Sequence, residues 1–277
     1  MLIQVHEDLI DAIDIYVTSE PEVELPEEPS PPQSIRKRRS RESYESVASS
    51  TANAAGNTTP QAKRPPVNKP LLVVGESGVG KTTLLARWLA DVNIPEAFVL
   101  PHFVGCSSSS FDHFAICRRL LLELQRAFRF DGRLSDRPEQ MVGQLIPWLR
   151  RAANRRGTGL IIILIDGIDA LHNESAQKLD WLPAELPEGV KLIVSATLNT
   201  PTYKVLRNEF RLKVKDIVEV PDRIDVDEKL ALIGQCLRPV GKTFDPKVQA
   251  QLTSAEQSDN PTFLRMTMDF LLDHAKW

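Results

Sequence analysis

The sequence predicts an α/β fold, in which a mostly parallel sheet carries helices on both faces and a small helical subdomain follows it. Short apolar runs with the length of buried strands alternate with segments of helical periodicity. One run, at residues 160–165, is apolar without interruption, which is typical of a strand buried on both faces. From residue 225 onward the pattern is entirely helical.

The same patterns place the individual elements. Strands are expected near residues 69–74, 97–104, 160–165, 190–195 and 216–220. Helices are expected after the first strand and near residues 111–128, 138–154, 174–182, 202–209, 226–237, 245–257 and 261–275. We therefore expect an α/β domain at residues 67–224 and a helical subdomain at residues 225–277.

Composition narrows the class of protein. The chain has 277 residues, of which 42% are hydrophobic and 26% charged, so it can bury a sizeable core. A net charge of −3 argues against a general nucleic-acid binder, because phosphate contacts require a basic excess. Three cysteines without a repeated CxxC spacing suit a reducing compartment, and no apolar run is long enough to span a membrane. We expect a cytoplasmic protein.

The N-terminal region has a different composition. Residues 1–18 place apolar side chains at near-helical spacing among acids, which predicts either a short amphipathic helix that could dock on a partner or a frayed terminus. Residues 19–66 are rich in Pro, Ser, Glu and Ala, and they are expected to be disordered. The basic cluster at residues 36–41 could be a nuclear address, a phosphorylation-controlled patch around Ser40, or a solvated charge run.

A glycine-rich motif lies between the first strand and the first helix of the α/β domain. Residues 75–82 fit the pattern GxxxxGK[ST] in full, in the strand–loop–helix order that a P-loop requires. Glycines allow backbone N–H groups to converge on phosphate oxygens, and the helix N-terminus adds a positive dipole end. The lysine can reach the β- and γ-phosphates, and the threonine hydroxyl can ligate Mg²⁺. The residues expected at the nucleotide are Gly75, Glu76, Ser77, Gly78, Val79, Gly80, Lys81, Thr82 and Thr83.

Two aspartates follow the apolar strand at residues 160–165. Asp166 lies at the carboxyl end of that strand, where parallel sheets bind ligands, and we expect it to hold Mg²⁺ together with Thr82. Asp169 could orient or deprotonate the attacking water, or it could cap the following turn or helix. Lys81, Asp166 and Asp169 are therefore the candidate catalytic residues.

Other nucleotide-binding classes fit less well. The guanine-reading NKxD motif of GTPases is absent, and DxxG fails because Asp169 stands at the glycine position. A small-molecule phosphotransferase would need an acceptor pocket and lid arginines, and no stretch of the sequence spells these out.

Several motifs together resemble one family. The motifs are GESGVGKTTLLARWL at 75–89, HFVG at 102–105, IIILIDGIDAL at 161–171, LIVSATLNT at 192–200 and NPTFL at 260–264. They look like the nephrocystin-type, NACHT-like branch of the STAND P-loop ATPases over residues 69–277. The resemblance implies an ASCE-type sheet of order 5-1-4-3-2, ATP as the nucleotide, an adenine contact from Pro261, and a signalling switch or scaffold.

The chain also departs from that family. Residues 195–199 contain no arginine, although many family members place a γ-phosphate-sensing arginine after the fourth strand. Ala170 replaces the acid that usually follows DGxD. The family continues into a winged helix and a repeat array where this sequence reaches Trp277, so we expect a truncated form, an incomplete gene model or a minimal module.

Two functions remain open at this point. The first is an ATP-binding switch module with slow Mg²⁺-dependent hydrolysis, and the second is a non-catalytic scaffold that holds ATP or ADP as a structural ligand. In either case protein partners are expected through the helical subdomain or the N-terminal region, and the chain could form a homo-oligomer.

Overall fold

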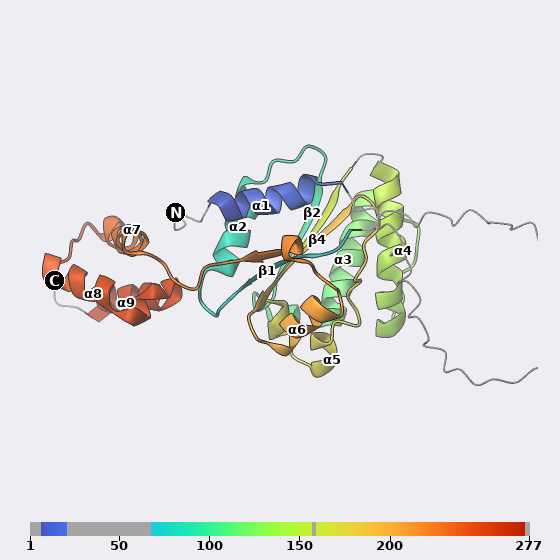
Figure 1. Cartoon of the computed structure of the whole chain (residues 1–277). Helices are drawn as coiled ribbons and strands as arrows, with labels where there is room; N and C mark the ends of the chain where they lie inside the picture. Colours follow the sequence, from blue (N-terminus) through green and yellow to red (C-terminus); the bar gives the residue numbers. More distant parts are fainter. Residues whose placement is uncertain (1–6, 21–67, 157–158, 275–277) are drawn as a thin grey trace, which may run out of the picture.

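The computed structural model describes residues 7–20, 68–156 and 159–274 of the chain (Figure 1). Nearly all of the segment expected to be disordered, with its basic cluster at residues 36–41, lies outside the described residues. No helix among the described residues combines the length and the apolar character that crossing a bilayer requires.

Five parallel strands form a single sheet at the centre of the α/β layer. They are β1 (Leu71–Gly75), β2 (Phe98–Phe103), β3 (Ile161–Asp166), β4 (Val190–Thr197) and β5 (Ile217–Glu219). Their order across the sheet is β2-β3-β4-β1-β5, and every adjacent pair is parallel. This confirms the predicted order 5-1-4-3-2, read from the opposite edge.

Nine α-helices and several short 3-10 turns surround or follow the sheet in the described part of the chain. The helices are α1 (Glu7–Thr18), α2 (Lys81–Asp91), α3 (His113–Phe128), α4 (Pro138–Arg156), α5 (Glu174–Gln177), α6 (Pro201–Asn208), α7 (Val226–Leu237), α8 (Pro246–Ser254) and α9 (Pro261–His274). The turns used below are η1 (Ser108–Phe111), η2 (Ile168–Ala170) and η5 (Glu256–Asp259).

Most element boundaries differ by a few residues from the sequence prediction, and two of the differences matter for the fold and the site. Strand β4 extends to Thr197, two residues past the predicted end, so Ser195 lies inside the strand rather than at its last position. Helix α5 has only four residues instead of the nine expected at 174–182. Leu179 has a φ of 59°, which is incompatible with an α-helix and leaves the following residues in turns.

Alternate residues of the strands pack on opposite faces of the sheet, as the two-residue period of a strand requires. Leu72 and Val74 of β1 belong to a core cluster shared with α3, α4 and α6. Leu71 and Val73 belong to a second cluster, shared with α1 and α2. The sheet is therefore covered on both faces, which explains the uninterrupted apolar run of β3.

Helix α1 packs against its own domain. Ile13 and Val17 are fully or almost fully buried in the cluster that contains Trp88 of α2. The Trp88 indole N–H donates to Asp14 Oδ1 at 2.8 Å, and the Tyr16 hydroxyl donates to the carbonyl of Lys69 at 2.7 Å. The α/β domain predicted at residues 67–224 does not include this helix. The apolar face of the helix, which could have docked on a partner, packs instead against the α/β domain of the same chain.

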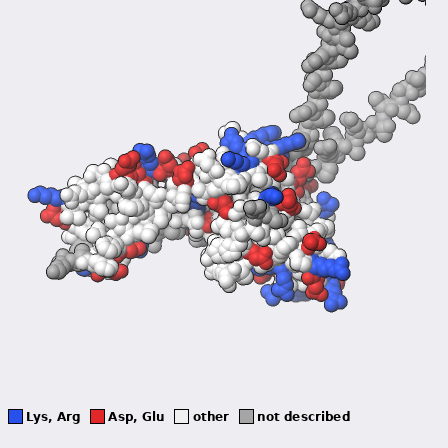
Figure 2. Space-filling model, turned by 90° about the horizontal axis from the view of Figure 1, so that it is seen from below, with Lys and Arg blue, Asp and Glu red and all other residues white. Residues whose placement is uncertain are grey.

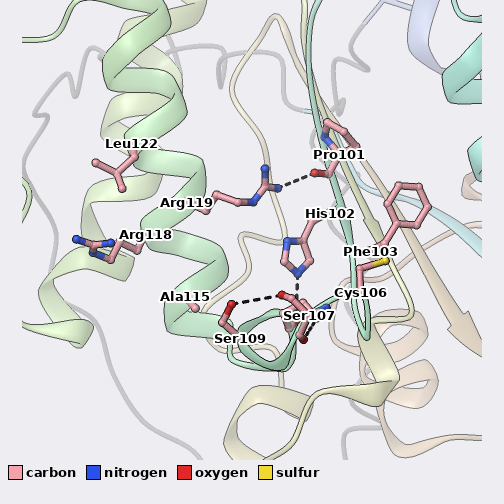
Figure 3. Close-up of a pocket in the computed structure, with 11 residues that line it drawn as sticks. Pro101, His102, Phe103, Cys106, Ser107, Ser109, Ala115, Arg118, Arg119 and Leu122 are labelled. Carbon is pink, nitrogen blue, oxygen red and sulfur yellow. Dashed lines mark hydrogen bonds between the residues drawn. The ribbon is translucent and has the colours of Figure 1, made fainter.

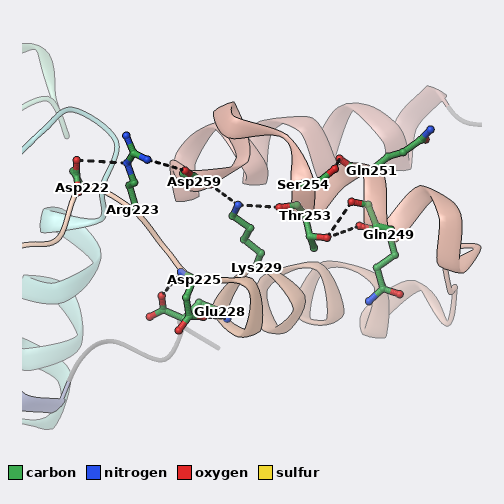
Figure 4. A network of polar contacts seen from close by, with 11 residues as sticks. Asp222, Arg223, Asp225, Glu228, Lys229, Gln249, Gln251, Thr253, Ser254 and Asp259 are labelled. Atoms are coloured by element: carbon green, nitrogen blue, oxygen red, sulfur yellow. Dashed lines mark hydrogen bonds and ion pairs between the residues drawn. The ribbon is translucent and has the colours of Figure 1, made fainter.

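Helices α7, α8 and α9 form a separate lobe beside the α/β layer (Figure 1). Leu232, Leu264 and Met268 are buried in its own small core. Buried Lys229 of α7 pairs with Asp259 of η5 and donates to the Thr253 carbonyl of α8 at 2.9 Å, which ties α7 to these two elements (Figure 4). On the face of the lobe that Figure 2 shows, charged residues lie mainly along the rim and the middle carries few of them.

Candidate functional site

The glycine-rich loop joins β1 to α2 and has the backbone conformation of a phosphate-binding loop. Gly78 and Gly80 have φ values of 81° and 105°, a region that favours glycine. At Gly78 an added Cβ would also lie 2.8 Å from Asn260 Oδ1, so a side chain there would displace the Asn260 side chain from the loop. These two glycines are therefore required by the loop's shape as well as by its motif.

Lys81 lies at the start of α2 and folds back over the loop. Its Nζ donates to the carbonyls of Gly75 and Glu76 at 2.9 and 2.8 Å. Burial lowers the pKa of Lys81, while the negative charges of Asp169, Asp166 and Glu76 act in the opposite direction. The ammonium group of Lys81 thus lies at the loop under the influence of these carboxylates. A bound phosphate could replace the two carbonyls as its hydrogen-bond acceptor.

Thr82 and Asp166 are brought together from two elements that lie far apart in the sequence. The Thr82 hydroxyl donates to Asp166 Oδ2 at 2.7 Å. The other carboxylate oxygen, Oδ1, accepts from the Ser195 hydroxyl at 2.5 Å, and Ser195 Oγ in turn accepts from the Gly167 N–H at 2.8 Å. Hydroxyl and carboxylate oxygens are the hard donors that Mg²⁺ prefers, so this pair fits the ion.

Asp169 lies in η2 and is half-buried. Its negative charge raises the pKa of Lys81, against the lowering by burial. Capping of the next helix, α5, falls instead to Asn173, whose Oδ1 accepts from the Ala176 N–H. The role of Asp169 at an attacking water stays a prediction.

The start of α9 lies directly on the P-loop. Asn260 Nδ2 donates to the Ser77 carbonyl at 2.9 Å, and the Thr262 hydroxyl donates to the Gly78 carbonyl at 2.7 Å. Pro261, the expected adenine contact, lies between these two residues and is buried. The adenine contact stays a prediction, but the structure brings Pro261 to the loop.

The side chains of the remaining loop residues differ in their exposure to solvent. The side chains of Glu76 and Ser77 are exposed, and that of Thr83 is half-buried in the first turn of α2. Val79 is buried in the core cluster beside α2, so its side chain supports the loop and only its backbone could face a phosphate.

Sequence reasoning missed three residues of this site. Ser195 is named from the sequence only within residues 195–199, which lack an arginine, and Asn260 and Thr262 only as members of the NPTFL motif. A signal for Ser195 was present, because a hydroxyl that follows the apolar residues 192–194 of a buried strand needs a buried partner. The bonds of Asn260 and Thr262 to the P-loop had no local signal, since they join residues more than 180 positions apart.

The sheet order, the loop conformation and the Thr82–Asp166 pair define a P-loop NTPase domain. Residues 67–199, just under half of the chain, match the family model described as an AAA domain. The class shown by the fold and the site is therefore a P-loop NTPase domain, and residues 67–199 of it are similar to the AAA family.

Known proteins are similar to this chain over part of their length. Nephrocystin-3 of Mus musculus is 36% identical over 134 residues, which cover 47% of this chain and 10% of that protein. A TPR repeat-containing protein of Dictyostelium discoideum is 24% identical over 246 residues, covering 74% of this chain and 14% of that protein. The chain thus spans only about a tenth to a seventh of the length of these curated relatives.

Among solved structures, the fold is similar to that of Cdc6p from Pyrobaculum aerophilum. The two are 15% identical with a TM-score of 0.47, and the match covers 73% of this chain and 54% of that chain.

Proposed function

We propose that this chain is an ATP-binding signalling switch or scaffold module that hydrolyses ATP slowly in a Mg²⁺-dependent reaction. The observation that carries the proposal is the direct attachment of the helical lobe to the P-loop. Asn260 and Thr262 hold the carbonyls of Ser77 and Gly78, so a change in the loop's backbone alters contacts of α9. A nucleotide shifts the equilibrium between two conformations only if it interacts differently with each of them. Because the bonds from Asn260 and Thr262 join the lobe to the loop that binds the nucleotide, two positions of the lobe would present different loops to it.

In this proposal the chain's own residues divide the work. The loop amides and Lys81 bind the phosphates, and Thr82 and Asp166 would hold Mg²⁺, which neutralises charge on the transferred phosphoryl group when bound. Asp169 orients the attacking water or accepts its proton. Pro261, at the junction of the lobe and the loop, contacts the adenine.

Slow turnover follows from the surroundings of the fourth strand. Residues 195–199 contain no arginine, and the Ser195 hydroxyl is already committed to Asp166. Charge that develops on the γ-phosphate is therefore stabilised less than in sites with a cationic partner there. The same observation favours the second candidate function, a scaffold that holds ATP or ADP and does not hydrolyse it.

The signalling part of the proposal rests on two further features. Relatives contain TPR repeats, and such repeats form extended binding surfaces. Helix α9 also exposes Phe263, Met266 and Phe270, which are 46%, 67% and 62% exposed and share one face of the helix. Protein partners of the lobe are part of the proposal, as is a cytoplasmic location.

A single-turnover assay with γ-labelled ATP tests hydrolysis. We expect phosphate release well below the ~10 s⁻¹ median of enzymes, with ADP retained. A rate of several per second that does not depend on protein concentration would contradict slow turnover. ATP that binds and is never cleaved would favour the scaffold.

Substitution of Asn260 tests the coupling between the lobe and the loop. Its Oδ1 caps α9 by accepting from the N–H groups of Thr262 and Phe263. Asn260→Ser keeps a hydroxyl that can cap the helix, but it removes the amide that donates to the Ser77 carbonyl. We expect ATP affinity to change by up to about tenfold, the equivalent of one hydrogen bond of about 0.5–1.5 kcal/mol. Asn173→Ser, the same change at the start of α5, is the matched control, and equal ATP affinities for both variants would oppose the coupling.

A further inference from the structure

A cavity of about 550 Å³ opens beside the free edge of β2 and is not used by the proposed function (Figure 3). Its walls come from the end of β2, the η1 turn and one side of α3. The polar side chains that line it include those of His102, Cys106, Ser107, Ser109, Arg118 and Arg119. The cavity lies at the carboxyl end of the strands, the edge at which parallel sheets bind ligands.

The cavity is basic. None of its 11 lining residues is acidic, and two are arginines. Arg119 reaches across to β2, where Nη2 donates to the Pro101 carbonyl at 2.7 Å, and its buried Nε has no partner in the structure (Figure 3). Burial lowers the pKa of Arg119 and Glu123 of the same helix raises it, yet an arginine stays charged at any physiological pH. A partly buried cation of this kind is stabilised by an anion.

Two hydroxyls add donors to the cationic wall. Ser107 Oγ and Ser109 Oγ lie 3.4 Å apart in and before η1, and both residues are exposed. Burial lowers the pKa of His102, and the charge of Arg119 acts in the same direction, while the hydrogen bond that its Nε2 donates to the Ser110 carbonyl, at 3.1 Å, acts in the opposite one. Guanidinium and hydroxyl groups are the donors that recognise carboxylate and phosphate oxygens.

The shape of the edge excludes one kind of ligand. Pro101 has no N–H, and its carbonyl is already bonded to Arg119, so an extended peptide cannot add to β2 as a further strand at this point. Ala115 and Leu122 of α3 give the cavity an apolar side as well. A compact ligand with both an anionic group and an apolar body matches these walls.

We propose that this cavity binds a small organic anion, whose phosphate or carboxylate group contacts Arg119 and the hydroxyls of Ser107 and Ser109. The apolar body of the ligand packs against Ala115 and Leu122. The site adjoins the strand that carries the metal-binding aspartate, since the Val104 N–H that follows β2 donates to the Asp166 carbonyl at 3.0 Å. It is distinct from the P-loop, which lies three strands away at the end of β1.

Cys106 provides a built-in reporter of occupancy. It lines the cavity and is exposed, whereas Cys117 and Cys236 are buried. The experiment measures alkylation of Cys106 by neutral iodoacetamide while phenyl phosphate or benzoate is titrated, in the Lys81→Ala background so that phosphate binding to the P-loop does not interfere. We expect saturable protection by at least one probe and none by phenol, and the probe that protects identifies phosphate or carboxylate as the anionic group.

Variants assign the protection to the cavity. Arg119→Gln removes a charge-assisted contact, so the half-protecting concentration should rise about ten- to a hundredfold, and Arg119→Lys should lie between. Arg150→Gln, an exposed arginine on α4 outside the cavity, should leave it unchanged. If Arg119→Gln fails to fold, the Arg118→Gln, Ser109→Ala double variant carries the same test. Absence of protection by both anions at millimolar concentration, or protection that these cavity variants do not weaken, overturns the proposal.

Discussion

The hydroxyl of Ser195 donates a hydrogen bond of 2.5 Å to Oδ1 of Asp166, and Oδ2 of the same carboxylate accepts from Thr82 at 2.7 Å. Ser195 is fully buried in β4, the strand between β3 and β1. The carboxylate is therefore held in one orientation from the strand beside it, with one oxygen directed at the first turn of α2. This arrangement prepares the oxygen pair of Thr82 and Asp166 for a metal ion.

Ser195→Ala should weaken Mg²⁺-dependent ATP binding. The variant removes a hydrogen bond to a charged group of about 1.5–3 kcal/mol, and part of that loss should appear as a higher Mg²⁺ concentration for half-maximal ATP binding. Calorimetric titration of ATP at several Mg²⁺ concentrations measures it. Ser254→Ala, at the exposed end of α8, is the control, and identical Mg²⁺ dependence in both variants would show that Ser195 does not orient Asp166.

Lys81→Ala should reduce ATP affinity about ten- to a hundredfold. The ammonium group supplies a charge-assisted contact of about 1.5–3 kcal/mol, and each 1.4 kcal/mol corresponds to about a factor of ten. Lys247→Ala, at an exposed position of α8, should leave the affinity unchanged. ATP affinity in Lys81→Ala within twofold of wild type would remove Lys81 from the nucleotide site.

The two aspartates at the end of β3 and in the turn after it should have separable effects on ATP binding and on hydrolysis. Asp166→Asn removes a negative charge beside the metal and should weaken Mg²⁺-dependent binding. Asp169→Asn should leave ATP affinity unchanged and slow single-turnover hydrolysis by about 10²–10⁴, the usual range for a general base. Equal hydrolysis rates for Asp169→Asn and wild type would assign Asp169 a structural role.

Helix α1 should be part of the cooperative unit that unfolds. Ile13 is 0% exposed beneath the helix, and Ile15, on its outer side, is 68% exposed. We expect Ile13→Ala to lower the free energy of unfolding by about 2–5 kcal/mol and Ile15→Ala to change it by no more than about 0.5 kcal/mol. Urea denaturation of the two variants provides the comparison, and equal small effects would mean that α1 is detached in solution.

Lys191 should make stability depend on pH in a defined window. Its Nζ donates to the Ser19 carbonyl at 2.8 Å, and burial lowers its pKa to about 8 from an ordinary value of 10.5. Between these two pH values the folded state has lost the proton that the unfolded state still binds, so the contribution of Lys191 to stability rises with pH. Wild type should therefore gain stability relative to Lys191→Met as the pH is raised from about 8 toward 10.

That comparison must be made against the variant rather than on wild type alone. Burial raises the pKa of Cys117 to about 12, and the pKa of Tyr16 is also raised, chiefly by burial. Both groups oppose folding at high pH, because their unfolded forms lose a proton first. The contribution of Cys117 cancels in the difference between wild type and Lys191→Met. Tyr16 lies under Lys191, whose Nζ is 4.8 Å from the ring centroid, but an unfolded tyrosine loses its proton only at pH ~10, so its effect is confined to the upper end of the window. A difference that stays constant over the window would contradict the shifted pKa of Lys191.

The parts of the molecule that were correctly predicted are those specified by short stretches of chain. The glycine loop at 75–82 is recognisable because its chemistry lies within eight consecutive residues, and β3 is recognisable because burial on both faces requires an unbroken apolar run. The strand order was implied by resemblance to a family and is confirmed. The helix at 174–182 was wrong over half its length, because the left-handed Leu179 is not encoded by helical periodicity.

The remaining features depend on contacts between distant segments. Asn260 meets Ser77 across 183 positions, and Tyr16 meets Leu192 across 176, so neither pair has a local pattern. The cavity beside β2 arises in the same way, because Arg119 approaches Pro101 only when α3 folds back along the sheet edge. Local chemistry specifies which groups can bind a phosphate or a metal. Long-range packing specifies which of those groups meet, because a side chain's neighbours depend on how the strands and helices stack and not on the order of residues within any one of them.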